Sequence, residues 1–515
     1  MTKPVRGPRL VSLQRVRVLA CAAAIVLAPA VAFAPVLFSA EPAPPDAAYR
    51  DETARIVGAA ITSDRAWTRL SELCDGIGHR LSGSKSLERA VVWARDAMRA
   101  DGLDSVWLQP VRVPYWRRGP KETAEILGKT NQRLDVLALG RSVGTPKGGL
   151  TAPVVAVSSF HELNSLPASA VKGKIVLYDV PFTKYGETVR YRSNGARRAA
   201  ARGAVAVLVR SVTPTSLRTP HTGTTSAYPD SFPKIPAAAV TLEDAAMIRR
   251  LIARGEQVRV RLEMHPDTLP WALSHNVIGE LRGRERPEEV VVVGGHLDSW
   301  DVGQGAQDDG GGCVISMEAL RLLKDLGLRP RRTLRCVLWT NEENGIEGGK
   351  AYAKEYGSRN RHVAAIESDG GVERPVGFNV RMFRVGTDST DTTRTQVALG
   401  RLKPFGPLLA GIGAGTIGDA GGGADIEPLM KLGVPGVEHQ TTMANYFDWH
   451  HTHADMMDKV DPVELRKNVA AMAVMAYVLA EMPGTLADSP AVPAQAPGAA
   501  AGTGAGARSS RVTNQ

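Results

Sequence analysis

The segment from Glu289 to Gly312, EVVVVGGHLDSWDVGQGAQDDGGG, places one histidine and four aspartates among glycines, directly after a run of four valines. Apolar β-branched residues bounded by glycine predict a strand that is buried on both faces. The histidine and the aspartates then lie in a loop at the carboxyl end of that strand. Because ligands of open α/β sheets bind beyond the carboxyl ends of the strands, this loop is a candidate metal site.

Carboxylates or imidazoles occur at or just after the ends of several predicted strands. Taken alone, each would more often be a turn former or a helix cap. Together, on one side of one sheet, they bring carboxylates close without a cation partner, a cost that metal ions remove. Histidine mixed with carboxylates favours zinc, whereas an all-oxygen set would favour calcium or magnesium. The five pieces are His296–Asp298, Asp308–Asp309, Glu342–Glu343, Asp369 in IESDGG and His451 in WHHTHAD.

Strand-like and helix-like segments alternate after SHNVIGELRG: EVVVVGG, GCVISMEALRLLKDLG, TLRCVLWT, GGKAYAKEYG and HVAAIESD. Such alternation predicts βαβ units, so the expected fold class is α/β, with a mostly parallel sheet covered by helices. A helical pattern also precedes it, with ERAVVWARDAMRADGL ending at a glycine. We therefore predict one discontinuous domain over residues 49–133 and 265–483.

Residues 134–264 differ from the flanking segments in their sequence pattern, which predicts an inserted module. They contain short β segments such as APVVAV, GKIVLYDV and AVAVLVRS, so we expect a β-rich fold. Because both ends of the insert join the main domain, it should lie beside the metal site and narrow it. Residues 484–515 are rich in Ala, Gly, Pro and Ser without apolar periodicity and predict a disordered tail.

The first forty residues carry five cations and then an apolar run from Val18 to Ala40. This pattern is typical of an export signal. An uncleaved membrane anchor is the alternative, although Pro29 and Pro35 interrupt the run. We therefore predict residues 1–40 to be a signal peptide or an anchor. The expected location is secreted or extracytoplasmic, including the periplasm, with membrane association only if the segment stays uncleaved.

The charge and the cysteines exclude some classes of function. The chain of 515 residues has a net charge of +10, but five of the cations lie in the first forty residues and the rest are spread. An excess without a basic stripe does not predict nucleic-acid binding. Cys74, Cys313 and Cys336 are an odd, sparse set, which predicts buried thiols and no disulfide framework.

Taken together, the motifs resemble those of a known enzyme family. GGHLDSWDVGQGAQDDGGG, LWTNEENG, ESDGG and HHTHAD resemble the di-zinc exopeptidases of clan MH, and most closely their glutamate carboxypeptidase branch. The likeness extends to GIGHRLSGSKSLERAV, KGKIVLYD, TPHTG and KIPAAAVTLEDA, and covers roughly residues 49–482 in order. The insert is similar to a protease-associated domain. The resemblance implies a zinc exopeptidase fold, two Zn²⁺ ions and a homodimer.

The resemblance also implies a role for each residue of the candidate site. Asp298 would accept the second N–H of His296 and fix its tautomer. Glu342 would be the general base of peptide hydrolysis through a metal-activated water. The Asp308–Asp309 peptide bond would be cis. The zinc ligands would be His296 and Asp369 for one ion, Glu343 and His451 for the other, and Asp308 for both.

Four further residues are weaker candidates. His450 stands where related carboxypeptidases have a tyrosine that steadies the oxyanion, so it is either a catalytic donor or a packed histidine. Asp425 is expected to cap a helix that ends at Gly433, while its loop would line the substrate pocket. Tyr446 is a second pocket candidate. For His221, an ordinary surface loop is slightly favoured over a role at the edge of the pocket.

The leading functional hypothesis is a secreted zinc metallopeptidase, of the carboxypeptidase, dipeptidase or aminopeptidase type, that acts on short peptides or dipeptides. A non-catalytic receptor, as in the transferrin-receptor branch of the clan, is disfavoured because all five ligand positions and Glu342 are kept. A glutaminyl cyclase is the third class, of similar fold but usually with one zinc. Release of free amino acids from dipeptides, as opposed to pyroglutamate formation from glutaminyl peptides, would separate the peptidase from the cyclase.

Overall fold

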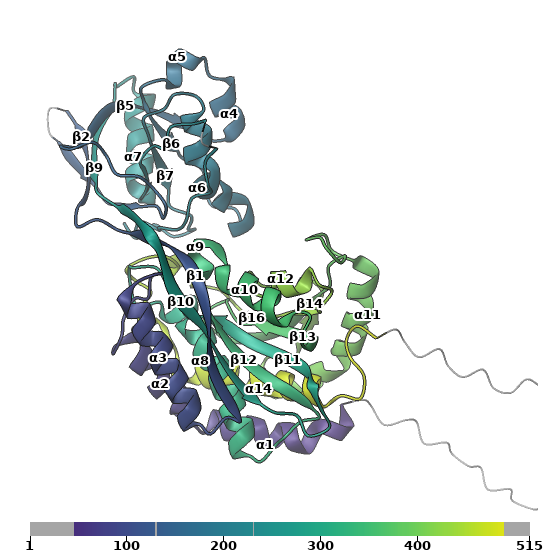
Figure 1. Cartoon of the computed structure of the whole chain (residues 1–515). Helices are drawn as coiled ribbons and strands as arrows, with labels where there is room; N and C mark the ends of the chain where they lie inside the picture. The colour runs from purple at the N-terminus through teal and green to yellow at the C-terminus, as the bar shows by residue number, and fades with distance from the viewer. Residues whose placement is uncertain (1–45, 129–130, 230, 489–515) are drawn as a thin grey trace, which may run out of the picture. The chain divides into compact units, whose positions relative to one another are not determined.

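The computed structural model describes residues 46–128, 131–229 and 231–488 (Figure 1). The predicted export segment, residues 1–40, lies outside the described residues, as does the predicted tail from residue 489 onward. Leu486, which the sequence assigned to that tail, is instead buried in the main core. Within the described ranges, no helix combines the length and the apolar character needed to cross a membrane.

The first sheet has eight strands and a parallel centre. Strands β12, β11, β13 and β16 run parallel to one another, while β10 pairs antiparallel with β1 and β12, and β14 pairs antiparallel with β16. The expected α/β sheet, parallel where the site was predicted, is confirmed. In order across the sheet, the strands are β1 (Ser105–Arg117), β10 (Asp267–Leu281), β12 (Arg332–Trp339), β11 (Arg286–His296), β13 (Arg361–Glu367), β16 (Gly436–Thr441), β14 (Pro375–Arg381) and β15 (Thr416–Gly418).

Helices cover both faces of this sheet (Figure 1). Helices α1, α2, α8 and α14 contribute to one core and α10 and α12 to the other. The helices are α1 (Arg50–Ile61), α2 (Arg65–Cys74), α3 (Lys85–Ala100), α8 (Gly311–Asp325), α9 (Glu342–Gly345), α10 (Glu347–Tyr356), α11 (Thr392–Leu402), α12 (Glu427–Met430), α13 (Tyr446–Trp449) and α14 (Pro462–Glu481), with short turns η1 (Ala47–Tyr49), η2 (Ala306–Gly310), η3 (Lys403–Ile412) and η4 (Met457–Lys459).

The valine run of β11 shows why this strand is apolar along its whole length. Val291 and Val293 lie in the core that includes α8 and α14, whereas Val290 and Val292 lie in the core of α10 and α12. Successive side chains of a strand point to opposite faces, so a strand covered on both sides needs apolar residues at every position. The strand then ends at His296, where the chain leaves the core for the predicted site.

The chain leaves the first sheet after β1 and returns in β10, and a second eight-stranded sheet forms between them. Its first strand begins at Glu122, ahead of the expected boundary at residue 134, because the alternating ETAEIL pairs antiparallel with β9. The strands, in order, are β3 (Gln132–Leu134), β2 (Glu122–Leu127), β9 (Arg259–Met264), β5 (Leu150–Val157), β6 (Ile175–Tyr178), β7 (Ala206–Arg210), β8 (Ala237–Val240) and β4 (Val136–Ala138).

The inserted segment also contains helices. These are α4 (Phe160–Ser165), α5 (Ala168–Val171), α6 (Tyr185–Ala200) and α7 (Leu242–Ala253). Thr241 caps α7 by accepting a hydrogen bond from the amide of Asp244. The three cysteines among the described residues are free and buried, as predicted.

Candidate metal centre

The strand ends of the first sheet bring the five predicted ligands together. His296 is the last residue of β11, and Glu343 lies in α9, directly after β12. Asp369 follows β13, and His451 follows α13, the short helix after β16. Because β12, β11, β13 and β16 are parallel, their carboxyl ends meet at one edge, and the fifth ligand, Asp308, reaches the same edge from η2.

Asp308 lies between two histidine–carboxylate pairs. Its Oδ1 is 3.2 Å from Nε2 of His296, and that nitrogen is 3.3 Å from Oδ1 of Asp369. Its Oδ2 is 3.1 Å from Nε2 of His451, and that nitrogen is 3.0 Å from Oε2 of Glu343. One carboxylate therefore faces both pairs, one oxygen to each.

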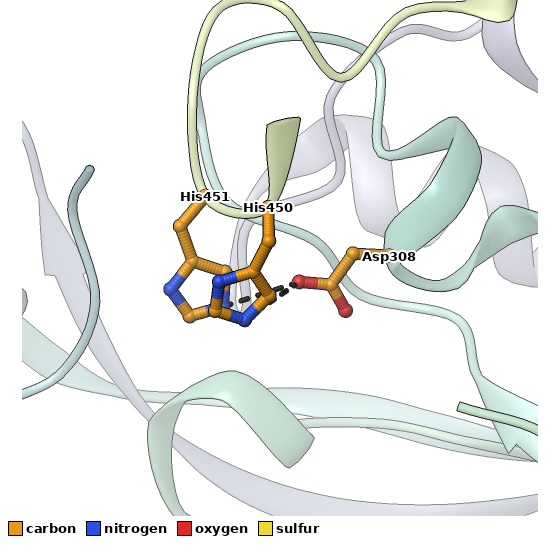
Figure 2. A group of neighbouring side chains, drawn as sticks. All are labelled: Asp308, His450 and His451. Carbon is orange, nitrogen blue, oxygen red and sulfur yellow. Dashed lines mark ion pairs between the residues drawn. The ribbon is translucent and has the colours of Figure 1, made fainter. Parts of the chain in front are cut away.

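His450 lies parallel to His451 and faces the same carboxylate (Figure 2). The ring centroids are 3.5 Å apart, and Nε2 of His450 is 3.6 Å from Oδ2 of Asp308. Nδ1 of His450 is buried and makes no hydrogen bond within the described ranges. Burial, together with the neighbouring His451, lowers the pKa of His450 well below its ordinary value, which favours a neutral ring.

The tautomer of His296 is fixed by a backbone group. Its Nδ1 lies 2.9 Å from the carbonyl oxygen of Asp298, so Nδ1 donates and Nε2 faces the acids. Asp298 therefore accepts this N–H, as the resemblance implied, but through its backbone: the nearest carboxylate oxygen is 3.9 Å away. The carboxylate instead accepts a hydrogen bond of 3.0 Å from the amide of Glu342. Asp298 therefore holds both His296 and Glu342.

A residue of the insert fixes His451. Nδ1 of His451 is 3.2 Å from the carbonyl oxygen of Thr222 and also 3.2 Å from Nη1 of Arg192, while its Nε2 faces the acids. The amide of Thr222 in turn donates to the carbonyl of His451 at 3.0 Å. On the opposite side, Nε1 of Trp300 donates to Oε2 of Glu343 at 2.5 Å.

The loop that carries Asp308 is held by a buried carboxylate that lies 147 residues later in the sequence. Asp455 accepts hydrogen bonds from the amides of Ala306, Gln307 and Asp308 at 3.0, 2.7 and 3.2 Å. Asp309 accepts hydrogen bonds from the amides of His296 and Gly312, and one of its carboxylate oxygens lies within 4.8 Å of ligand atoms of His296 and Asp369. The peptide bond between Asp308 and Asp309 is cis, as the resemblance implied.

Some carboxylate oxygens of the centre have no hydrogen-bond partner among the described residues. Oε1 of Glu343 and Oδ1 of Asp369 are buried and make no hydrogen bond among the described residues. Burial raises the pKa of Glu342 well above its ordinary value, and the charges of Asp369 and Glu343 raise it further. Cations between these groups would offset that cost. Three histidine–carboxylate combinations have ligand atoms within 4.8 Å of one another, and Asp308 belongs to two of them. The donor set therefore fits divalent metal ions of the zinc type.

A cavity of about 340 Å³ opens onto this centre and is lined by both parts of the molecule. Its insert side includes Tyr185 and Arg192 of α6, and its other wall includes Tyr446. Arg192 donates to the carbonyl of Thr222 at 3.1 Å and to the hydroxyl of Tyr185 at 2.9 Å, but its Nε has no partner. The insert thus lies beside the centre, as expected from its topology.

Two predictions about residues around the centre, Asp425 and His221, are wrong. Asp425 does not cap a helix: α12 begins at Glu427 with Ile426 as its N-cap, and no side chain caps it. The Asp425 carboxylate is buried instead, and neither of its oxygens makes a hydrogen bond in the described structure. It does not line the cavity, although its neighbour Ala424 does. His221 is 2% exposed, so its segment is buried against the centre and is no surface loop.

Four residues that shape the centre were not predicted from the sequence. Trp300 and Asp455 stand inside motifs that carry ligands, HLDSWD and HHTHAD, so their position beside the ligands was an available signal. Thr222 stands in TPHTG, one of the segments that resemble the family. Arg192 lies on α6 among other arginines, and no local pattern distinguishes it.

Comparison with known proteins agrees with the geometry. The Peptidase family M28 model matches residues 276–476, and the PA domain model matches residues 150–248. Carboxypeptidase Q from Xenopus laevis is 43% identical over 438 residues, which cover 84% of this chain and 90% of the relative. Carboxypeptidase Q from Homo sapiens is 43% identical over 420 residues, covering 81% and 86%.

Solved structures give the same result. The peptidase M28 precursor from Shewanella amazonensis SB2B has a TM-score of 0.80 at 36% sequence identity, covering 86% of this chain and 99% of that chain. A zinc aminopeptidase from Bacillus subtilis, at 20% identity and a TM-score of 0.58, covers 82% of this chain and 96% of that one and shares the fold. The resemblance read from the motifs is confirmed, and the insert is a PA domain. The chain belongs to peptidase family M28 and is a metallopeptidase.

Proposed function

We propose that this chain is a di-zinc exopeptidase that hydrolyses dipeptides or short peptides at a centre bridged by Asp308. The observation that carries the proposal is that the two oxygens of Asp308 face two separate histidine–carboxylate pairs. His296 and Asp369 would hold one zinc ion, and Glu343 and His451 would hold the other. When bound, the ions supply Lewis acidity, which acidifies a water and polarises the scissile carbonyl.

Glu342 is the proposed general base. It lines the cavity beside Asp308 and Asp369, and the Asp298 carboxylate fixes its backbone. Its carboxylate takes a proton from the attacking water as the water oxygen bonds to the scissile carbon. It returns that proton to the leaving nitrogen as the C–N bond breaks, so the products are a free carboxylate and a free amine. Glu343, one residue on, points to His451 and is assigned to metal binding.

Arg192 is the proposed binding group for the free carboxylate of the substrate. It is the one Lys or Arg among the described residues that line the cavity, and it makes no ion pair within the described structure. Its Nε is a buried donor without a partner. An unpaired guanidinium in a cavity favours an anionic ligand, because a carboxylate offsets its desolvation. This favours carboxypeptidase or dipeptidase action over aminopeptidase action.

His450 is proposed to donate a hydrogen bond to the oxyanion that develops on the scissile carbonyl. A neutral imidazole keeps one N–H, and the ring lies at the cavity wall beside Asp308. The relatives' names, carboxypeptidase Q and zinc aminopeptidase, support the reaction class and the metal. Export and homodimer formation stay predictions of the sequence and its resemblance.

A panel of dipeptides, assayed on zinc-loaded protein, tests the proposal. We expect release of free amino acids from dipeptides with a free carboxyl terminus, and little from the same peptides as carboxyl amides. N-terminal acetylation should have the smaller effect. Formation of pyroglutamate from glutaminyl peptides without amino acid release would contradict the proposal and favour a cyclase. Equal cleavage of long folded proteins would contradict the restriction to short peptides.

A further inference from the structure

Thr222 of the PA domain lies against a ligand of the metal centre. It is fully buried, and both of its backbone polar groups meet His451: the amide donates to the His451 carbonyl at 3.0 Å, and the carbonyl accepts from Nδ1 at 3.2 Å. The same carbonyl accepts from Arg192 at 3.1 Å. Nη1 of Arg192 also lies 3.2 Å from Nδ1 of His451, but a histidine that binds a cation through Nε2 carries its proton on Nδ1. Thr222 is then the acceptor, and Nε2 faces Glu343 and Asp308.

The side chain of Thr222 is held by an ion pair that is only slightly exposed. Its hydroxyl donates to the carbonyl of Ala138 at 2.8 Å and accepts from Nη2 of Arg118 at 3.2 Å. Nε of Arg118 lies 3.0 Å from each carboxylate oxygen of Asp301, and Nη1 lies 2.9 Å from Oε1 of Glu122. The side chains of Arg118 and Asp301 are only 12% and 11% exposed.

Arg118 therefore joins both parts of the molecule at one point. Asp301 stands in the loop after β11, next to Trp300, which donates to Glu343. Ala138 and Thr222 belong to the inserted part of the chain, and Glu122 opens its sheet. A charged pair out of water persists only with good geometry and further hydrogen bonds, and Arg118 has both.

We propose that Thr222 is a positioning residue of the metal centre: the PA domain supplies the hydrogen-bond partner that fixes His451, and the Arg118–Asp301 pair holds Thr222 in place. This inference rests on the proposed zinc function. The first pair of ligands needs no such help, because His296 is fixed by the carbonyl of Asp298 in its own loop. Binding of metal by His451 and docking of the Thr222 segment should therefore strengthen each other, since such coupling is reciprocal.

Thr222→Val and Thr222→Ser form a matched pair for the test. Valine keeps the shape of the side chain but removes the hydroxyl that binds Arg118 and Ala138, whereas serine keeps it. We expect Thr222→Val to weaken zinc binding at one of two sites by about 10- to 100-fold, as for other partners of metal-bound histidines. Thr222→Ser should bind zinc like the parent protein. The absorption spectrum of the cobalt-loaded protein should change in the valine variant alone.

A second pair keeps the test valid if Thr222→Val does not fold. Arg118→Met removes the group that holds Thr222 and should weaken zinc binding at the same site. Arg117→Met, at the residue before Arg118, is the control. It breaks only an exposed ion pair with Asp267 and should leave zinc binding unchanged. Thermal unfolding of each variant without zinc separates a loss of fold stability from a loss of metal affinity.

Hydrogen exchange gives the reciprocal measurement. The amide of Thr222 donates to the His451 carbonyl, so zinc should slow its exchange in the parent protein and slow it less in Arg118→Met. If the parent binds two zinc ions and cleaves dipeptides while Thr222→Val and Arg118→Met bind zinc equally tightly, the positioning role is overturned and the proposed function stands. If the parent binds no zinc, the proposed function fails and the inference fails with it.

Discussion

The two halves of the candidate centre use the same donor types but are fixed in different ways. In the half formed by His296 and Asp369, the partner of the histidine Nδ1 is the carbonyl of Asp298, two residues further along the chain. In the half formed by Glu343 and His451, that partner is Thr222, which is 229 residues away in the sequence. Local chain geometry sets the first half, whereas packing of the PA domain sets the second.

This difference explains what each half requires of the fold. The first half needs the end of β11 and the loop behind it, which the valine run and the glycines specify. The second half also needs Trp300 on one side and the Thr222 segment on the other. Asp308 belongs to both halves, and Asp455 holds its loop. Substitutions can therefore act on one half, on the other or on both.

The largest effect is expected from Asp308→Ala, because this carboxylate is the one shared group. It should lose metal from both halves and abolish dipeptide hydrolysis, whereas Asp369→Ala and Glu343→Ala should each lose the metal of one half. Metal content per chain, measured on the three variants after the same dialysis, checks this. An Asp308→Ala protein that still holds two ions would show that the halves do not share a ligand.

The next largest effect separates the two adjacent glutamates. Glu342→Gln should keep both metals and lower turnover by about 10² to 10⁴, because the amide cannot carry the proton. Glu343→Ala should instead lose the metal of the second half. Turnover on one dipeptide and metal content are measured side by side. Loss of metal from Glu342→Gln, with both ions kept in Glu343→Ala, would reverse the two roles.

A smaller effect is expected from Arg192→Met on the PA-domain side of the cavity. Loss of a hydrogen bond to a charged group costs about 1.5 to 3 kcal/mol, so kcat/KM for a dipeptide should fall about 10- to 100-fold. Hydrolysis of the corresponding carboxyl amide should fall less, because loss of the Arg192 bond to the Thr222 carbonyl affects both substrates alike. Arg190→Met, an exposed position on the same helix, is the control. Equal losses on both substrates would mean that Arg192 does not bind the substrate carboxylate.

The smallest effect concerns acid stability away from the centre, which must be known before metal loss in acid is interpreted. Burial, with the nearby charge of Arg335, lowers the pKa of His362 to about 4. The folded state therefore favours the neutral ring, and its stability is present above pH 6.5 and declines as the pH falls toward 4. We expect a decline of about 2 kcal/mol at pH 5.

Urea unfolding at pH 7 and pH 5 measures this decline, and His362→Gln should reduce it. His362 contacts the Tyr352 hydroxyl at 3.0 Å, a neutral hydrogen bond that glutamine can also form. If the variant and the parent protein lose the same stability between the two pH values, His362 does not account for the acid sensitivity of this region.

The sequence was enough to predict the elements of the first half and the meeting of all five ligand candidates. The reason is physical: parallel strands end at one edge, so residues just after them converge whatever the loops do. Contacts made by packing were not predictable in this way. Nothing local marks Thr222 or Arg192 as neighbours of His451, because the chain brings them together through a separate sheet. Asp425 was misjudged because the helix it was expected to cap is a single short turn.

The atom through which Asp298 acts was not predictable either. The resemblance implied correctly that Asp298 accepts from the imidazole, but only the structure shows that the loop presents the backbone carbonyl to the ring and the carboxylate to the Glu342 amide. The boundary of the insert shifted because β2 pairs with β9, a strand more than a hundred residues later in the chain. Pairings between distant strands depend on the register of both, which neither segment specifies alone.

The central claim is that Asp308 joins two metal sites, and anomalous X-ray diffraction from zinc-soaked crystals tests it most directly. The account predicts two zinc peaks, one beside Oδ1 of Asp308 with His296 and Asp369, and one beside Oδ2 with Glu343 and His451. A single peak, or two peaks with Asp308 bound to only one of them, would contradict it.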